Sequence, residues 1–248
     1  MKYAIDKQFG LWRHMKQPVM GERFFRLAER IVKTEKYFHS HKNVNVDTIT
    51  VQTPDNYPLK SYLITPNNLN SNAIILYLDN AEALGVSAEK IIVAGDSAGG
   101  NLALGVFYNA VNENITKPHA LMLVYPVVDN LMQTESMKKF TDTPMWNAVL
   151  NEAMWKVYLP TDSAKDLFKR NHVEANLYTE FPSTYIESAE FDCLRDEALD
   201  LANKLQIAGI NLTINETKGT MHGYDQVDCE ISRENIKKRI NWLSQTIR

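Results

Sequence analysis

Short apolar runs alternate with segments of helical periodicity along most of the chain. Continuous apolar runs are typical of strands that are buried on both faces of a parallel sheet. They occur at residues 73–78, 91–94, 121–125, 184–189 and 212–214. The segments 101–111 and 195–208 carry apolar residues at helical spacing, and Gly209 is expected to follow the second helix directly. This alternation predicts an α/β fold with a mostly parallel sheet and helices on both of its faces.

The residues before residue 73 follow a different pattern. Residues 20–37 have one apolar face at helical spacing and predict an amphipathic helix. Residues 44–53 and 59–65 are rich in β-branched and aromatic side chains, and the turn-forming residues Pro54-Asp55-Asn56 lie between them. The sequence therefore predicts an antiparallel hairpin near the N-terminus.

Two further helical segments are predicted towards the C-terminus. Residues 130–173 fit no alternation of strand and helix, but they hold apolar residues at helical spacing, namely Trp146, Val149, Leu150, Met154 and Trp155. We interpret this region, about 130–175, as an inserted helical cap, although the same stripe also fits ordinary core packing. The last helix places Ile236, Ile240, Leu243 and Ile247 on one stripe, which predicts the buried face. The whole sequence, residues 1–248, is predicted to form a single domain.

Composition and charge narrow the class of protein. The chain has 248 residues, 44% apolar and 23% charged, and a net charge of −3. This balance offers no basic surface for nucleic acid. The longest apolar run, residues 120–128, is far shorter than the roughly 20 residues of a membrane span. The start of the sequence lacks the apolar stretch of a signal peptide, and two cysteines form no disulfide framework or metal motif. We expect a cytoplasmic protein.

The strongest chemical signal is Gly95-Asp96-Ser97-Ala98-Gly99, between an apolar strand and a helix. A G-x-S-x-G segment in this context predicts a nucleophile elbow, a tight turn that exposes the serine. The positions two before and two after the serine, Gly95 and Gly99, are expected to be small so that the turn can close. The amide of Ala98 would then point to the place where an oxyanion forms.

A serine hydroxyl needs a base before it can act as a nucleophile. Where such an elbow occurs, the chain order is serine, acid, histidine. Three histidines follow Ser97. His119 precedes a strand and so lies at the wrong end of the sheet, and His172 lies in the predicted cap. His222 is in a loop of small residues after the last predicted strand, and it is the candidate base.

The acid is expected at the carboxyl end of the strand that precedes residue 190, because reacting groups gather at that edge of a parallel sheet. Asp192 stands just beyond that strand. Asp196 is a rival, but it falls on the first turn of the next helix, where an acidic residue is favoured for other reasons. Glu190 is a second rival. We select Asp192.

These residues resemble the α/β hydrolases of the hormone-sensitive-lipase type, the group of microbial acetyl esterases and carboxylesterases. The similar segments are residues 95–103, 125–126, 192–197 and 222–224, and the spacings of 95 and 30 residues between Ser97, Asp192 and His222 also agree. The resemblance covers nearly the whole chain. It implies Ser97 as nucleophile, His222 as general base and acid, and Asp192 as the residue that orients His222. It also implies hydrolysis of a small ester without a metal or cofactor.

The sequence departs from the family in one place. Members carry a His-Gly-Gly-Gly segment after the third strand, whose amides complete the oxyanion hole. Here the predicted strand 73–78 continues directly into residues 79–90, which resemble the family's segment just before the elbow strand. An internal block that includes this segment is therefore expected to be absent.

Two functions from different classes remain open. The chain could be a serine carboxylesterase that hydrolyses short-acyl esters through an acyl-enzyme. It could instead be a catalytically impaired α/β-hydrolase-like protein that at most binds a small molecule. A serine peptidase is the weaker third reading, because the chain has no segment for anchoring a peptide. The lost oxyanion donor distinguishes the first two, since one such donor contributes about 10²–10³ to the rate.

Overall fold

The apolar runs pair as four parallel strands in the computed structural model of the chain. The order across the sheet is β3-β4-β5-β6, which is also their order in the sequence. The strands are β3 (Ile92–Asp96), β4 (Ala120–Val124), β5 (Ser183–Phe191) and β6 (Leu212–Met221). All five residues of β4 are buried, which explains why its sequence is continuously apolar and does not alternate.

The structure describes residues 2–17, 44–52, 58–66, 90–159 and 177–247. Contacts divide the chain into two compact units, Met1–Val19 with Ala73–Arg248, and Met20–Asn72. Three predicted elements lie outside the described residues, namely the helix at 20–37, the turn at 54–56 and the strand at 73–78. The place where the family segment is expected to be missing also lies outside them. That residues 1–248 form a single domain stays a prediction.

The smaller unit contains the expected hairpin. Strands β1 (Val44–Gln52) and β2 (Pro58–Pro66) pair antiparallel, with Val44 opposite Pro66 and Gln52 opposite Pro58. The prediction of an antiparallel pair is confirmed.

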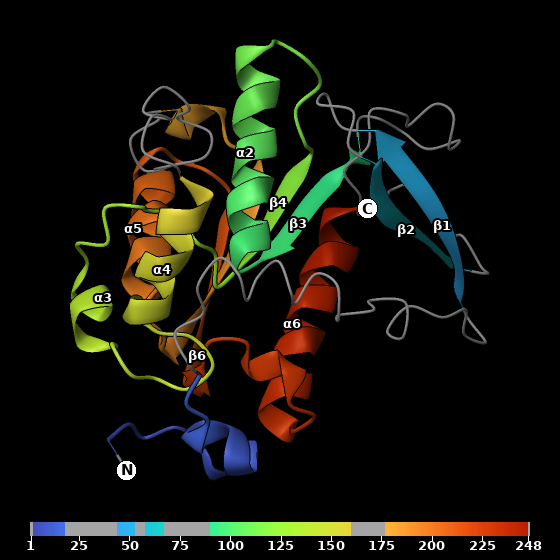
Figure 1. The fold of residues 1–248 in the computed structure, drawn as a ribbon. Helices are drawn as coiled ribbons and strands as arrows, with labels where there is room; N and C mark the ends of the chain where they lie inside the picture. Colours follow the sequence, from blue (N-terminus) through green and yellow to red (C-terminus); the bar gives the residue numbers. More distant parts are fainter. Residues whose placement is uncertain (1, 18–43, 53–57, 67–89, 160–176, 248) are drawn as a thin grey trace. The chain divides into compact units, whose positions relative to one another are not determined.

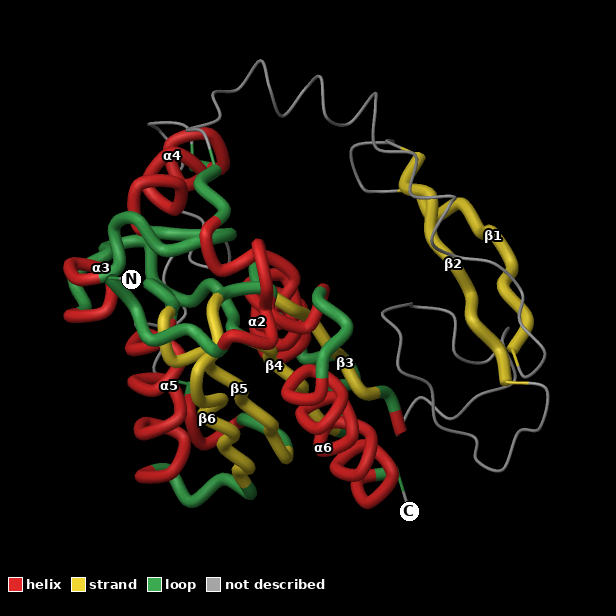
Figure 2. Tube along the Cα trace, turned by 90° about the horizontal axis from the view of Figure 1, so that it is seen from below, coloured by secondary structure: helices red, strands yellow, loops and turns green. Residues whose placement is uncertain are grey.

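Helices cover both faces of the four-stranded sheet, as predicted (Figure 1). On one face, α2 (Ala98–Asn112) and α5 (Arg195–Ile207) pack against the sheet. The buried apolar side chains between these helices and the sheet include Val93, Leu121, Leu123, Ile186, Leu104, Phe107, Leu201 and Leu205. On the other face, α6 (Glu230–Thr246) and the short helix η1 (Lys7–His14) pack against Ile92, Met122 and Tyr185. Figure 2 shows β5 and β6 between α5 on one side and α6 on the other.

The region between β4 and β5 contributes two helices among the described residues. They are α3 (Glu135–Lys139) and α4 (Ala148–Tyr158). Trp155 of α4 is buried in a cluster with Met137, Phe140 and Leu194, whereas Val149 on the same helix is exposed. A short turn of helix, η5 (Tyr178–Glu180), precedes β5, and another, η6 (Tyr224–Gln226), follows β6.

The predicted buried face of the last helix is confirmed for two of its four residues, because Leu243 and Ile247 are partly buried and pack against the core. Ile236 and Ile240 of α6 are 37% and 54% exposed, so the face that meets the sheet is rotated away from these two residues. The buried residues of that face are Ser232, Asn235 and Trp242. The cause lies in β5 and β6, where Glu187 and Asn215 face α6 and hydrogen-bond to polar side chains of that helix. Burying the Glu187 carboxylate without hydrogen-bond partners would cost more free energy than exposing the two isoleucine side chains.

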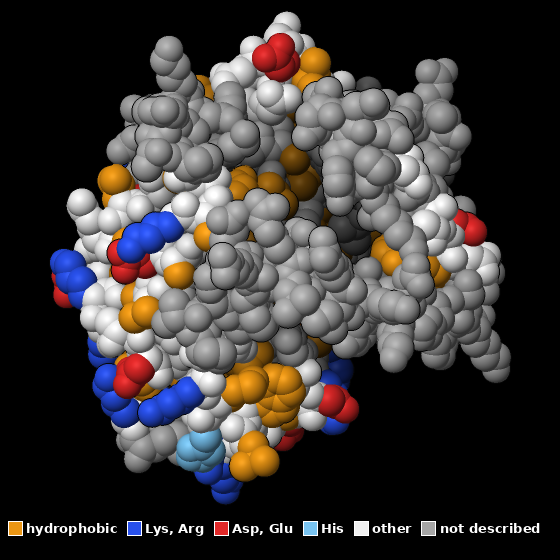
Figure 3. Space-filling model, viewed as in Figure 1, with side chains coloured by type: hydrophobic (Ala, Val, Ile, Leu, Met, Phe, Trp, Pro, Cys, Tyr) orange, Lys and Arg blue, Asp and Glu red, His pale blue; other side chains and the backbone are white. Residues whose placement is uncertain are grey.

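The surface of the described residues carries charges of both signs. On the face seen in Figure 3, lysine and arginine side chains are interspersed with aspartate and glutamate. No helix in the described part of the chain has the length and apolar character to cross a bilayer.

Candidate active site

Ser97 occupies a strained turn between β3 and α2. Its φ of 55° and ψ of −122° lie in a region that residues with a side chain rarely adopt, at a cost of about 1–3 kcal/mol. Backbone hydrogen bonds hold the turn: the Ser97 amide donates to Val124 O at 2.9 Å, and the amides of Gly100 and Val127 both donate to Ser97 O at 3.0 Å. The strain is therefore maintained by the neighbouring strand β4 and the residues after it.

Two glycines allow this turn to close. A Cβ atom on Gly95 would lie 2.1 Å from Gly99 O, and one on Gly100 would lie 2.5 Å from the Cβ of Pro126. A larger residue at either position therefore forces the neighbouring atoms to move. At Gly99 the nearest described atom would be Asp96 Oδ1 at 3.9 Å, an ordinary contact. The expectation that Gly99 must be small for steric reasons is therefore replaced by the same requirement at Gly100.

Ser97, His222 and Asp192 lie in hydrogen-bond contact. Ser97 Oγ is 2.8 Å from His222 Nε2, and His222 Nδ1 is 2.7 Å from Asp192 Oδ2. With the imidazole proton on Nδ1, the ring donates to Asp192 and accepts from the Ser97 hydroxyl. Asp192 is fully buried and also accepts from the amide of Leu194 at 3.0 Å. The three residues come from the turns that follow β3, β5 and β6, at the carboxyl edge of the sheet.

The rival residues have other partners. Asp196 accepts from the Ser136 amide at 2.7 Å, and Glu190 accepts from the Gly219 amide at 2.7 Å. His119 Nε2 lies 3.2 Å from the carbonyl oxygen of Thr246. His172 lies outside the described residues. Among the described candidates, only His222 and Asp192 form a hydrogen-bonded chain with Ser97.

The amide of Ala98 is the candidate oxyanion donor. Ala98 is the first residue of α2, and Ser97 is its N-cap. The first amides of a helix have no partner within the helix, and the helix dipole adds a partial positive charge there. The family segment that would supply a second donor is expected to be absent, and the place of that absence, within residues 67–89, lies outside the described ranges.

Two aromatic rings contact His222, and the sequence reasoning assigned neither of them to the site. The centroid of the Tyr125 ring lies 4.7 Å from that of His222, and the Trp146 centroid lies 6.0 Å away. Trp146 comes from the region predicted as a cap, and its Nε1 donates to Asn151 Oδ1 at 3.2 Å. Tyr125 follows β4 directly. The Tyr-Pro pair shared with the resembled family was the available signal for Tyr125, and the aromatic stripe was the signal for Trp146.

A buried glutamate supports the residues after β4. Glu197 Oε1 accepts from the amide of Val128 at 2.7 Å and, more distantly, from that of Asp129 at 3.4 Å. Asn101 Nδ2 donates to Val127 O at 3.2 Å from the other side. The segment that holds the Ser97 turn is thus attached to both α2 and α5.

Both cysteines are free and buried, so the prediction that they form no disulfide is confirmed. Burial raises the pKa of the Cys193 thiol, and the neighbouring Asp192 raises it further. Cys193 is therefore held as the neutral thiol beside the candidate acid. The described residues contain no group of three or more His, Cys, Asp or Glu side chains arranged to hold a metal ion.

Comparison with known proteins gives a consistent picture. A family model described as alpha/beta hydrolase fold matches residues 68–226. An AB hydrolase superfamily protein of Schizosaccharomyces pombe is 30% identical over 178 residues, which cover 66% of this chain and 50% of that protein. Ethyl acetate hydrolase of Pseudomonas putida is 26% identical over 151 residues, covering 59% and 46%. The chain spans about half the length of these curated relatives.

Solved structures are similar over a larger part of the chain. The structure named bacterial heroin esterase matches with a TM-score of 0.85 and 21% identity, and the match covers 99% of this chain and 98% of the other. At this level of identity, the similarity concerns the fold.

Proposed function

The chain belongs to the α/β hydrolase fold family, of the hormone-sensitive-lipase and carboxylesterase type, and we propose that it is a serine carboxylesterase for short-acyl esters. Ser97 is the proposed nucleophile, His222 the general base and acid, and Asp192 the residue that orients His222. The observation that carries the proposal is the chain of hydrogen bonds from Ser97 Oγ through His222 to Asp192, set on a strained turn between β3 and α2.

In the proposed first half-reaction, Ser97 Oγ attacks the carbonyl carbon of the ester while His222 Nε2 takes the hydroxyl proton. The carbonyl oxygen becomes an oxyanion, to which the Ala98 amide donates. When the intermediate collapses, the bond to the alcohol oxygen breaks, and His222 gives its proton to that oxygen. Asp192 stabilises the imidazolium that exists between the two transfers.

In the second half-reaction a water molecule replaces the alcohol. His222 takes one proton from the water while its oxygen attacks the acyl carbon. The bond to Ser97 Oγ then breaks and Oγ recovers the proton from His222. The products are a carboxylic acid and an alcohol, and no metal or cofactor is required.

Small esters are the proposed substrates. The resemblance to acetyl esterases, together with the names of ethyl acetate hydrolase and bacterial heroin esterase, supports this class. We also propose the cytoplasm as the location, because both cysteines are free thiols, as is usual in a reducing compartment.

The proposal is tested by hydrolysis of p-nitrophenyl acetate. We expect the unmodified chain to release p-nitrophenol, and Ser97→Ala to lower kcat by at least about 10³-fold, because triad residues act as a unit. Ser244→Ala, an exposed position on α6, is the matched control and should retain full activity. Hydrolysis that persists in Ser97→Ala would show that the serine is not the nucleophile. A chain that binds the ester without turnover would favour the binding-only alternative.

A further inference from the structure

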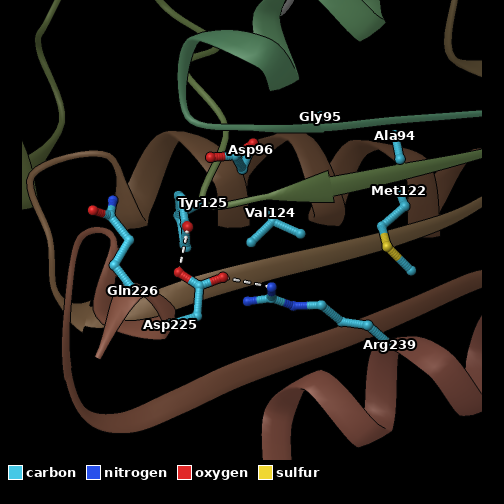
Figure 4. Close-up of a pocket in the computed structure, with 9 residues that line it drawn as sticks. All are labelled: Ala94, Gly95, Asp96, Met122, Val124, Tyr125, Asp225, Gln226 and Arg239. Carbon is cyan, nitrogen blue, oxygen red and sulfur yellow. Dashed lines mark hydrogen bonds and ion pairs between the residues drawn. The ribbon is translucent and has the colours of Figure 1, made fainter. Parts of the chain in front are cut away.

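A polar network lies behind His222 and joins the ends of two strands to α6. The Tyr125 hydroxyl donates to Asp225 Oδ1 at 2.6 Å, and Arg239 Nη1 donates to Asp225 Oδ2 at 2.6 Å. Figure 4 shows these side chains pointing towards one another, with Asp225 between the other two. Asp225 therefore joins the residue after β4 to the helix α6.

Arg239 is held on its other side by a second carboxylate. Glu187 of β5 is fully buried, and it accepts from Arg239 Nε at 3.1 Å and from Nη2 at 2.5 Å. The Tyr224 hydroxyl donates to the same carboxylate at 2.7 Å. Burial alone would lower the pKa of Arg239, but the bonds to Glu187 outweigh it and raise this pKa. The guanidinium stays charged and has a fixed position between Glu187 and Asp225.

The network reaches His222 by two routes. Through space, the Tyr125 ring contacts the imidazole at 4.7 Å between centroids, with the two planes at 59°. Along the chain, Tyr224 and Asp225 follow His222 by two and three residues. The same hydrogen bonds therefore fix the ring that touches the imidazole and the short turn that carries it.

Both packing and its hydroxyl hold the Tyr125 side chain, which is 3% exposed and whose ring centroid lies 6.3 Å from that of Tyr224. A cavity of about 390 Å³ is lined by Tyr125, Asp225, Gln226 and Arg239 and by residues of β3 and β4. Figure 4 shows this space beside Tyr125 and Val124. The hydroxyl bond to Asp225 therefore adds a directional restraint to the packing of the Tyr125 ring, and this bond fixes the ring beside His222.

We propose that Tyr125, anchored by Asp225 and Arg239, is a positioning residue that holds the His222 imidazole in line with Ser97 and Asp192. The inference rests on the proposed function for its catalytic consequence. Tyr125 does not transfer the proton, because its hydroxyl is directed to Asp225. Burial and the adjacent Asp225 raise the pKa of Tyr125, so the phenol remains neutral and continues to donate.

The test compares two tyrosine-to-phenylalanine variants. Tyr125→Phe removes the bond to Asp225. Tyr185→Phe is the matched control, because the Tyr185 hydroxyl also donates to a buried carboxylate, Glu187 at 2.8 Å, while its ring packs against Trp242. We expect Tyr125→Phe to lower kcat for p-nitrophenyl acetate about tenfold with KM nearly unchanged, since a misplaced base slows the chemical step and not binding. Tyr185→Phe should retain kcat.

A second measurement does not need turnover. The proton shared between His222 Nδ1 and Asp192 gives a downfield signal in the proton NMR spectrum, and His222→Gln assigns it. We expect the signal in the unmodified chain and in Tyr185→Phe, and its loss or broadening in Tyr125→Phe. Urea denaturation of both variants shows whether each is folded.

The outcomes separate the two proposals. If the unmodified chain is inactive, the proposed function fails, while the NMR comparison still decides the role of Tyr125. If Tyr125→Phe equals Tyr185→Phe in kcat and in the His222 signal, the positioning role is overturned. An equal loss in both variants would also overturn it, because the effect would then belong to the whole network.

Discussion

At the scale of single residues, Glu197 is a buried acid whose two carboxyl oxygens differ in their hydrogen bonding. One carboxyl oxygen accepts from the amides after β4, while Oε2 has no partner among the described residues. Burial raises the pKa of Glu197 well above its ordinary value, although the amides of Val128 and Asp129 oppose this. The folded chain therefore keeps a proton at a pH where the unfolded chain has released it.

This predicts a dependence of stability on pH. An ordinary glutamate loses its proton near pH 4.3. Above that pH the folded state binds more protons than the unfolded state, so Glu197 makes the free energy of unfolding fall as pH rises towards its raised pKa. Glu197→Gln keeps the accepting oxygen and has no proton to lose. Its stability relative to the unmodified chain should therefore increase by about 1.4 kcal/mol per pH unit in this window.

Urea denaturation of both proteins at several pH values measures the difference. Glu113→Gln, at an exposed position after α2, is the control and should follow the unmodified chain at each pH. A difference between Glu197→Gln and the unmodified chain that stays constant with pH would show that Glu197 is ionised in the folded protein.

At the scale of elements, the start of α2 is packed against the residues after β4. Gly100 meets Pro126 at a distance that leaves no room for a methyl group, while Gly99 beside it has only an ordinary described contact. Alanine is favoured over glycine inside a helix by about 1 kcal/mol. The two adjacent glycines should therefore respond in opposite ways to the same substitution.

We expect Gly100→Ala to lower the free energy of unfolding by about 1–3 kcal/mol through overpacking. Gly99→Ala should leave stability unchanged or raise it by up to about 1 kcal/mol. Thermal or urea denaturation measures both. Equal losses in the two variants would indicate that the helix start tolerates no side chain at either position.

The attachment of α6 to the sheet gives a second prediction at this scale. Arg239 bridges the buried Glu187 and Asp225, so Arg239→Met should leave two carboxylates without a counter-charge and cost about 3–5 kcal/mol. Arg233 on the same helix pairs with the exposed Asp228, and Arg233→Met should have little effect because solvent screens that pair. Denaturation in urea distinguishes them, and a small effect at both positions would contradict the assigned role of Arg239.

At the scale of the whole molecule, the predicted order of elements is largely observed. The apolar runs at residues 91–94, 121–125 and 184–189 lie in strands of a parallel sheet, and helices cover both of its faces as predicted. The last strand is longer than its apolar run, because β6 continues through polar residues to Met221. Its pairing with β5 satisfies the backbone whatever the side chains are, so its length could not be read from hydrophobicity.

The orientation of α6 is where a pattern argument failed in part. Periodicity ranks the faces of a helix by apolar content. It correctly selected Leu243 and Ile247, which pack against the core, but it also selected Ile236 and Ile240, which are exposed. The observed face carries Ser232 and Asn235 beside Trp242, and it meets Glu187, a fully buried charged residue of β5. The sequence of β5 shows the charged residue Glu187. Which side chain pairs with this buried charge, however, depends on which elements lie next to β5 in space.

The sequence by itself determined the fold class and the strand–helix alternation, and it was enough to propose Asp192 and His222 as the partners of Ser97, because these inferences follow from local residue patterns and from the rule that parallel strands end at one edge. The tertiary structure alone decided that Gly100 is the crowded glycine, that α6 buries Ser232 and Asn235 rather than Ile236 and Ile240, and that Tyr125 lies against His222. Each of these depends on contacts between residues far apart in the chain, such as Arg239 and Glu187. The energy of such contacts depends on the distance and burial of both partners, and neither quantity is a property of one segment.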